Sequence, residues 1–278
     1  MERKIHSEGG NTMEITAISD REKIKNFLLE EPYLHLYELG NLHEKIFSRS
    51  KWFCASENGA IKSAAMLHIS ENDNDNILFL LENKNTEAAV RLLQGIISNL
   101  PDCFYAHVSH DTAAMLNTVY ETSSPVIYNK MKITGDILLA RSIKYPEFTY
   151  RVNKNDFEAI NEFLRGINPE AFFTSAMIET GKYFIIRKNS DLIAMAGVHF
   201  YSKELKIAAI GNVATAPEYR GKGYAGSVAA TLCRDLWKDI KYIGLNVRAD
   251  NIPAIKAYEK MGFVYYSSHE EIRAKRIK

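Results

Sequence analysis

The sequence has few cysteines and no pattern that would pair them. Cys54, Cys103 and Cys233 form neither an even set nor a C-x-x-C spacing. The eight histidines are scattered, and no group of cysteine, histidine and carboxylate residues has the spacing of a metal site. The sequence therefore predicts a protein without disulfides and without a metal, as is typical of the reducing cytoplasm.

Long apolar runs and an excess of one charge are also missing. No apolar run reaches the length that crosses a membrane. Residues 1–12 are polar, which predicts a disordered leader and not a signal peptide. The 35 basic and 34 acidic side chains leave no basic excess of the kind that nucleic-acid binding favours. We therefore expect a cytoplasmic monomer or homodimer that binds neither membranes nor nucleic acid.

The 278 residues are enough for two domains, and the chain contains a weak internal repeat. The segment WFCASENGAIKSAAMLHIS, from Trp52, aligns without a gap with YFIIRKNSDLIAMAGVHFYS, from Tyr183, at an offset of 131 residues. Each segment predicts two strands joined by a polar turn. The repeat predicts duplicated domains over residues 13–141 and 148–278, with a linker around Pro146.

The stretch NVATAPEYRGKGYAGSVAATL, residues 212–232, predicts a strand, a glycine-rich basic turn and a helix. The glycines allow a ligand to approach the backbone closely, and N–H groups at the start of the helix have no partner within it. These donors, the helix dipole and the side chains of Arg220 and Lys222 all favour a phosphate or pyrophosphate. The turn therefore predicts an anion-binding site.

Two well-known phosphate motifs do not fit this turn. A P-loop requires serine or threonine after its lysine, and Lys222 is followed by Gly223. A dinucleotide site requires an acidic residue after the next strand, and Val247 is followed by Arg248. What remains is an R-x-x-G-x-A pattern, formed by Arg220, Gly223 and Ala225.

A second segment, GLNVRADNIPAIKAYEKMGF at residues 244–263, predicts a strand and a helix that stops at Gly262. Asp250 or Asn251 can cap this helix. Together with the R-x-x-G-x-A turn, the segment resembles the GNAT superfamily of N-acyltransferases. The resemblance implies a mixed α/β sheet with helices on both faces, the GNAT-like acyl-CoA N-acyltransferase fold in two tandem copies, and acetyl-CoA as the acyl donor.

The resemblance also implies where the coenzyme binds. The pantetheine arm would pair with the end of a strand like an added strand, and the phosphates would lie on the turn. We expect Gly211 to mark the bulge that opens the sheet there. The expected coenzyme-binding residues are Val213, Ala214, Thr215, Arg220, Gly221, Lys222, Gly223, Tyr224, Ala225, Gly226 and Asn251.

Acyl transfer needs an acid for the departing thiolate and a base for the amine. Tyr258 is the expected acid, because its pKa lies above that of a thiol, although it also fits the apolar face of its helix. Many family members have a glutamate where this chain has Asn246, so the base is His199, Glu179 or water. His68 takes the place of His199 in the first half, which favours a structural role for that histidine.

The first half has no equivalent of the glycine-rich turn. Residues 77–100, ILFLLENKNTEAAVRLLQGIISNL, contain no glycine before Gly95. Without glycines the backbone there cannot close around a pyrophosphate. We expect a degenerate GNAT-like copy that binds no coenzyme, and an unrelated α/β module is the alternative.

The sequence thus predicts an N-acetyltransferase that moves an acetyl or other small acyl group from coenzyme A to a primary amine. The acceptor would be a small molecule or amino acid, because a silent first half beside an active second half resembles the glycine N-acyltransferase-like branch. Phe172, Phe173 and Met177 are expected to shape its site. Two alternatives remain: a non-catalytic acyl-CoA sensor, which Asn246 favours, and a protein or peptide N-acetyltransferase.

Overall fold

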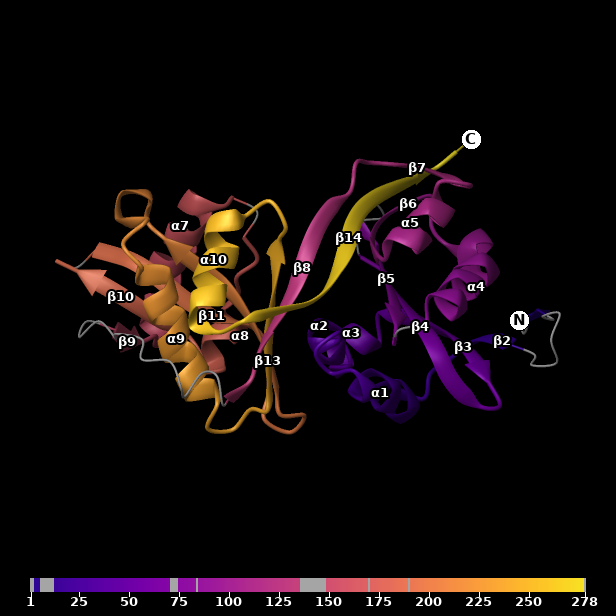
Figure 1. The fold of residues 1–278 in the computed structure, drawn as a ribbon, viewed down its shortest axis with the longest axis horizontal. Coiled ribbons are helices and arrows are strands. Elements are labelled where there is room, and N and C mark those ends of the chain that lie inside the picture. Colours follow the sequence, from indigo (N-terminus) through magenta and orange to yellow (C-terminus); the bar gives the residue numbers. More distant parts are fainter. Residues whose placement is uncertain are drawn as a thin grey trace. The chain divides into compact units, whose positions relative to one another are not determined.

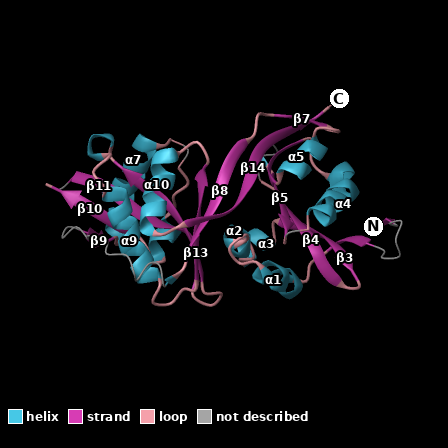
Figure 2. Cartoon of the chain, viewed as in Figure 1, coloured by secondary structure: helices cyan, strands magenta, loops and turns pink. Residues whose placement is uncertain are grey.

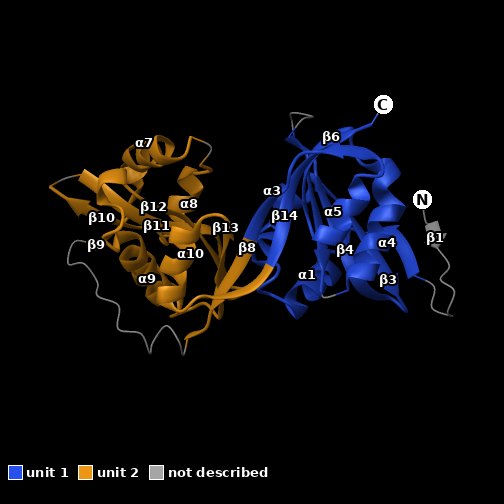
Figure 3. Cartoon of the chain, turned by 45° about the horizontal axis from the view of Figure 1, so that its top comes forward, with its two compact units in different colours: residues 1–128, 268–278 blue, residues 129–267 orange. Residues whose placement is uncertain are grey.

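A computed structural model describes residues 3–5, 13–70, 75–83, 85–135, 149–169, 171–189 and 191–277. The chain divides into two compact units, residues 1–128 with 268–278, and residues 129–267 (Figure 3). Among the described residues, no helix is long and apolar enough to cross a membrane.

The first unit is a meander of antiparallel strands followed by one parallel pair (Figure 1). Its strands are β1 (Arg3–Ile5), β2 (Met13–Ala17), β3 (Ser50–Glu57), β4 (Ala60–His68), β5 (Ile77–Glu82), β6 (Cys103–Val108) and β7 (Tyr120–Thr122). β5 and β6 pair in parallel. The helices are α1 (Arg21–Glu30), α2 (Leu36–Gly40), α3 (Glu44–Phe47), the crossover α4 (Thr86–Ile96) and α5 (His110–Leu116).

The second unit repeats this plan. Its antiparallel strands are β9 (Thr149–Arg151), β10 (Phe184–Lys188), β11 (Asp191–Ser202) and β12 (Ile207–Thr215), and β12 pairs in parallel with β13 (Tyr242–Arg248). The helices are α7 (Phe157–Ile167), α8 (Ser175–Glu179), the crossover α9 (Tyr224–Leu236) and α10 (Ile252–Met261).

The two hairpins β3–β4 and β10–β11 match in detail. Their turn residues Asn58 and Asn189 are 131 positions apart and both adopt a left-handed backbone, with φ of 51° and 49°. Asparagine tolerates this conformation better than most residues. The strand register also shifts at equivalent places, between Ala55 and Ser56 and between Ile186 and Arg187. The structure therefore confirms the tandem copies that the repeat predicts.

Each unit takes its last strand from the other half of the sequence. Strand β8 (Val126–Ile133) follows the first half and lies next to β13 in the sheet. Strand β14 (Val264–Arg276) follows the second half and pairs antiparallel with β6. The units therefore divide at 128/129 and 267/268, whereas the sequence predicts a boundary at 141–148. The predicted linker, residues 142–148, lies outside the described residues.

The beginning of the chain also differs from the expectation. Residues Arg3–Ile5 form β1, which pairs antiparallel with Met13–Ile15 of β2. The sequence predicts a disordered leader over residues 1–12, because nothing local there indicates a strand. Residues 1–2 and 6–12 lie outside the described part of the chain.

Helices cover both faces of the sheet in the second unit, as predicted (Figure 2). Residues 193–198 of β11 are all buried, which requires cover on each side. Tyr183 and Phe184 are neighbours and point to opposite faces. The Tyr183 hydroxyl contacts Met177 of α8, whereas the Phe184 ring contacts Arg151, whose guanidinium pairs with Asp235 of α9. Helices α8 and α9 therefore lie on opposite faces.

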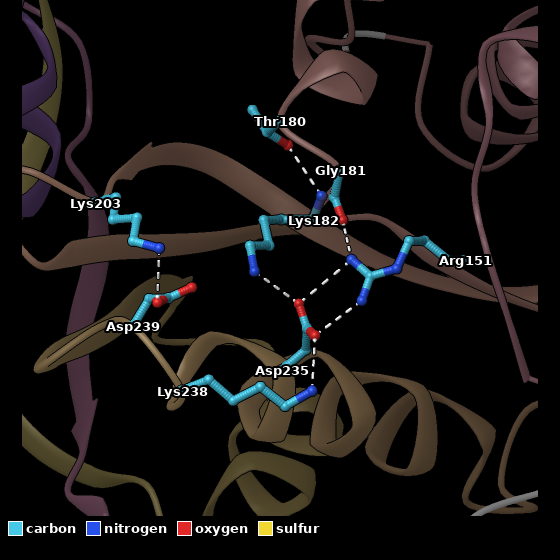
Figure 4. A network of polar contacts seen from close by, with 8 residues as sticks. All are labelled: Arg151, Thr180, Gly181, Lys182, Lys203, Asp235, Lys238 and Asp239. Carbon is cyan, nitrogen blue, oxygen red and sulfur yellow. Dashed lines mark hydrogen bonds and ion pairs between the residues drawn. The ribbon is translucent and has the colours of Figure 1, made fainter.

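A buried carboxylate anchors α9 to its sheet (Figure 4). Asp235 accepts hydrogen bonds from Arg151 at 2.8 Å and from Lys182 at 2.7 Å, and Lys238 lies 3.4 Å away. Burial alone would raise the pKa of Asp235, but the hydrogen bonds and positive charges of Arg151 and Lys182 lower it to about 2. This network fixes the helix that begins at the glycine-rich turn.

Replacing Asp235 with asparagine is expected to destabilise the protein by about 3 kcal/mol at pH 7, because Lys182 then stays buried without a counter-charge. The folded pKa lies below the usual value, so the carboxylate stabilises the fold above about pH 4 and loses this effect as the pH falls toward 2. The free energy of unfolding of Asp235→Asn and wild type is measured with urea at pH 7 and at pH 3. The difference between the two proteins should be larger at pH 7.

Asp239→Asn is the matched control for this prediction. Asp239 pairs with Lys203, which is 71 % exposed, so its loss should cost less than about 1 kcal/mol. Equal destabilisation in the two variants would contradict the anchoring role of Asp235.

Candidate active site

Strand β12 ends in a bulge that opens the sheet. Met195 lies opposite Ala214, and Gly197 lies opposite Gly211, so β12 advances by three residues where β11 advances by two. The extra residue follows Asn212, whose φ of 51° is left-handed.

On its other side, β12 separates from β13. Their pairing stops at Ile210 and Leu245, although β12 continues to Thr215 and β13 to Arg248. In the described chain no strand pairs with residues 211–215 on this side. The end of β12 therefore offers a backbone edge between two diverging strands.

Gly211 lies next to the bulge, and its role differs from the one predicted. The bulge itself is at Asn212 and Val213. A Cβ on Gly211 would come within 1.9 Å of the His199 ring. Glycine is therefore needed here because the imidazole of His199 occupies the space of a side chain.

A polar cluster forms around the Asn212 side chain. Its Nδ2 lies 3.1 Å from the Tyr183 hydroxyl and 3.2 Å from the carbonyl oxygen of Phe172, and its Oδ1 lies 3.4 Å from Nε2 of His199. The Tyr183 hydroxyl donates to the carbonyl oxygen of Val198 at 2.8 Å. The bulge thus brings the predicted His199 together with Asn212 and Tyr183, which the sequence reasoning did not single out.

The environment sets the protonation of both ring side chains. Loss of surrounding water lowers the pKa of His199, and its hydrogen bond with Asn212 partly opposes this, while the residue keeps an exposed surface. Burial raises the pKa of Tyr183 well above its usual value. At neutral pH His199 is therefore mostly neutral and able to accept a proton, whereas Tyr183 stays protonated.

The predicted acceptor residues lie beside this cluster. The Phe172 side chain is 66 % exposed, and Met177 is buried with its sulfur 3.9 Å from Nδ2 of Asn212. Phe173 contacts the Tyr183 ring at 5.5 Å. The three residues thus contact Asn212 or Tyr183, and Asn212 in turn contacts His199.

The glycine-rich turn follows β12 and starts helix α9. Gly221 and Gly223 both have left-handed backbones, with φ of 75° and 85°, and Gly223 is the N-cap of α9. The turn is exposed, and a Cβ at either glycine would meet nothing within 4 Å. The first N–H groups of α9, from Tyr224, Ala225 and Gly226, have no acceptor within the helix.

The two basic side chains of the turn donate hydrogen bonds to nearby main-chain carbonyl oxygens. Nε of Arg220 donates to the carbonyl oxygen of Thr215 at 3.3 Å, and Nζ of Lys222 donates to that of Glu218 at 3.1 Å. The Lys222 ammonium also lies 5.1 Å from the centre of the Tyr219 ring. Both cations thus remain close to the turn, where they favour an anion.

Helix α10 carries the predicted acid. Its N-cap Asn251 accepts a hydrogen bond from the N–H of Ala254 at 3.2 Å, and Gly262 ends the helix in a left-handed conformation, as predicted. Tyr258 is half-buried, with its ring edge-on to Phe263 at 5.7 Å. Because α10 packs against α9, the tyrosine and the turn belong to neighbouring helices.

The other predicted bases lie in different surroundings. Glu179 pairs with Nζ of Lys154 at 3.3 Å and is exposed. Asn246 lies on β13, just past the last residue that pairs with β12. Of the two side-chain bases, His199 is therefore the one that the structure places at the bulge.

These features lie within a stretch of sequence that matches a known protein family. Residues 144–263 match the model of the acetyltransferase (GNAT) family. The second half of the chain belongs to the GNAT family. This match contains the bulge, the glycine-rich turn and Tyr258, and the family implies acetyl-CoA as donor.

One curated relative matches a shorter stretch of the chain. It is the Bacillus subtilis protein named "Putative ribosomal protein bS18-alanine N-acetyltransferase", which is 34% identical over 83 residues. The match covers 29% of this chain and spans about half, 52%, of that protein.

Solved structures match nearly the whole chain. A Drosophila protein has a TM-score of 0.64 at 11% identity, over 95% of this chain and 98% of its own. A GCN5-related N-acetyltransferase from Sphaerobacter thermophilus has a TM-score of 0.62 at 12% identity, over 95% of this chain and 96% of its own. A tandem GNAT protein from the clavulanic acid biosynthesis pathway has a TM-score of 0.56 at 12% identity, over 95% of this chain and 98% of its own. At these identities the matches show the fold, two GNAT-like units in tandem.

The residues of the GNAT half fit acetyl-CoA. The edge of β12 can accept a strand-like pantetheine arm, and the exposed turn offers N–H donors and two cations to phosphates. Oγ1 of Thr215, at the end of β12, is buried and has no hydrogen-bond partner in the described chain. Buried polar atoms are nearly always paired, so this orphan fits a polar group of a ligand.

The first GNAT-like unit differs at the equivalent point. Helix α4 begins after Asn85, whose side chain accepts a hydrogen bond from the N–H of Ala88 at 3.1 Å. In the second unit the cap is Gly223, which has no side chain to occupy the helix start. One of the donors that a phosphate would need is therefore already used in the first unit.

Proposed function

We propose that the second unit transfers an acetyl or other small acyl group from coenzyme A to the primary amine of a small molecule or amino acid. One observation carries this proposal: the open edge of β12 runs directly into an exposed, glycine-rich, basic helix start. This arrangement suits a ligand with an amide-rich arm and phosphates. The residues proposed to hold it are 213–215, 220–226 and Asn251.

The chain supplies an acid for the leaving group. The amine nitrogen attacks the thioester carbonyl, the C–S bond breaks, and the amine gives up a proton. The Tyr258 hydroxyl donates its proton to the departing sulfur, since a phenol is protonated at neutral pH. A backbone N–H near Val213 stabilises the negative charge that develops on the carbonyl oxygen.

His199 is the proposed base. Its lowered pKa keeps the ring neutral at neutral pH, so it can take up the proton of the amine. If Nε2–H donates to Oδ1 of Asn212, the other ring nitrogen, Nδ1, carries the lone pair. Tyr183 and Asn212 are positioning residues, because they hold the imidazole and the bulge in place.

The acceptor is proposed to lie on the apolar surface beside His199. Phe172, Phe173 and Met177 border the Asn212 cluster, so they can contact the carbon skeleton of a small amine. Asn212 also contacts His199, the proposed base. This arrangement therefore brings an amine and its proton acceptor together.

Two rival functions are each favoured by one observation. The relative from Bacillus subtilis carries a name that specifies a protein alanine, which favours a peptide N-terminus as acceptor. Asn246 in place of a carboxylate favours an acyl-CoA sensor that transfers nothing. Retention of Tyr258 argues against a sensor, which has no thiolate to protonate.

A panel of acceptors tests the proposal. The full chain is incubated with acetyl-CoA and, separately, with free amino acids, small primary amines and peptides that begin with alanine, and products are identified by mass spectrometry. We expect kcat/KM for the best amino acid or small amine to exceed that of the best peptide by at least about tenfold, which corresponds to ~1.4 kcal/mol. A reversed order would favour the peptide acetyltransferase.

A further inference from the structure

Three side chains that can bind a metal lie together in the first unit. His107 lies on β6, and His269 and Glu271 lie on β14. Glu271 is directly opposite His107 in the antiparallel register. His269 precedes Glu271 by two residues, so both point to the same face of the sheet. Strand pairing thus brings together residues from opposite ends of the sequence.

Their distances match those around a bound cation. Oε1 of Glu271 lies 3.4 Å from Nδ1 of His107 and 3.4 Å from Nε2 of His269. One ligand atom of each residue lies within 4.8 Å of the other two. Two ligands bound at ~2.1 Å to a tetrahedral zinc ion lie about 3.4 Å apart. The group is therefore close to ligating geometry without rearrangement of the backbone.

Stacked rings hold the two imidazoles in place. The His107 ring lies 4.5 Å from that of Phe79 and is stacked on that of His269 at 5.4 Å. The ring of Tyr128 also stacks on that of His269, with their centres 5.5 Å apart. Ligands that are already oriented lose little conformational freedom when a metal binds.

One nitrogen of this group is also unsatisfied. The His269 side chain is only 10% exposed, and its Nδ1 is buried without a hydrogen-bond partner in the described chain. This Nδ1 lies on the opposite side of the imidazole from Nε2, so Nε2, which faces Glu271, is the ligating atom. His107 and Glu271 are 26% and 31% exposed, so a cation can reach the group from solvent.

We propose that His107, His269 and Glu271 bind a divalent transition metal of the zinc class, with a water as fourth ligand. Two imidazoles and one carboxylate suit zinc, cobalt or nickel better than calcium or magnesium, which prefer oxygen ligands. The ion would bind β14, the final strand, to β6. The sequence predicts no metal, because these ligands share no local spacing and meet only through the strand pairing.

Zinc titration of the full chain tests this site. The protein, purified without a histidine tag and stripped with a chelator, is titrated with zinc in a calorimeter. We expect one ion per chain, and Co²⁺ in its place should give the visible absorption of a tetrahedral site. At a hundredfold excess over the dissociation constant, zinc should raise the unfolding midpoint by roughly 5 °C or more.

Single substitutions assign the ligands. His269→Gln should weaken zinc binding by more than about 100-fold, since loss of even an outer contact can cost 10–100-fold. His107→Gln, at a more exposed position, serves the same purpose if His269→Gln does not fold. His110→Gln is the matched control, because His110, at the start of α5, pairs with Glu270 of β14 at 2.9 Å and is 86% exposed.

Three outcomes would overturn the proposal. Wild type could bind no zinc, which would leave a hydrogen-bonded group of two histidines and a glutamate. Either ligand variant, once folded, could bind zinc as tightly as the His110→Gln control. The Co²⁺ complex could also show the weak absorption of an octahedral aquo-ion, which would mean that these residues do not ligate it together.

Discussion

Replacing Tyr258 with phenylalanine is expected to lower the rate of acyl transfer by about 10²–10⁴, the usual contribution of a general acid. The change removes one hydroxyl and almost no volume, so the packing against Phe263 is kept and stability should shift little. Binding of acetyl-CoA should stay nearly intact, since we propose that the glycine-rich turn holds its phosphates. Steady-state thiol release and calorimetric acetyl-CoA binding measure the two quantities separately.

Tyr150→Phe is the control for this change. Tyr150 lies on β9, the edge strand of the second unit, and is 50% exposed. This variant should keep the wild-type rate. Wild-type turnover in Tyr258→Phe would mean that the thiolate leaves unaided or that another acid serves it. A loss of coenzyme affinity equal to the loss of rate would point to binding as the role of Tyr258.

Gly223→Val is expected to weaken acetyl-CoA binding by about 100-fold, while wild type binds one molecule per chain. The left-handed φ of 85° costs a non-glycine residue about 1–2 kcal/mol, and more for a β-branched one, so the turn should change conformation. The loss of two N–H bonds to a charged phosphate, at ~1.5–3 kcal/mol each, accounts for a reduction of this size or larger. Calorimetry on protein shown to be folded by circular dichroism measures it.

Gly59→Val controls for the strain itself. Gly59 has a similar φ of 79° and also has open space at its Cβ. It lies in the β3–β4 turn of the first unit, so its substitution should leave acetyl-CoA affinity unchanged. Equal affinities in Gly223→Val and wild type would show that the turn does not hold the phosphates. Two molecules bound per wild-type chain would contradict the proposal that the first unit binds none.

Local features of the second unit could be predicted from the sequence. The turn at Gly223 and the helix between Asn251 and Gly262 each depend on a few neighbouring residues with strong conformational preferences. The hairpin repeat was also visible, because Asn58 and Asn189 mark equivalent turns. These elements need little information from the rest of the chain.

Features that depend on distant partners could not be predicted in the same way. The exchange of β8 and β14 leaves no local signal, because a strand's own pattern does not specify which strand it pairs with. The three candidate metal ligands meet only through that exchange. The unit boundaries therefore could not be placed from the sequence.

The bulge in β12 was only partly predictable from the sequence. Asn212 could have been suspected, since asparagine adopts positive φ more readily than most residues, but the pattern drew attention to Gly211 instead. Tyr183 had a signal as well, because it occupies the position of the buried Trp52 in the repeat. Neither residue has a motif that would reveal its hydrogen bonds to the other.

The most direct test of the central claim follows the acetyl group itself. Acetyl-CoA labelled with ¹³C in its carbonyl is incubated with the full chain and the best acceptor of the panel, and free thiol and labelled amide are measured over time. We predict that both form in equal amounts and that both slow together in Tyr258→Phe. Tight binding of acetyl-CoA without labelled amide for any amine would contradict the transferase account and support the sensor.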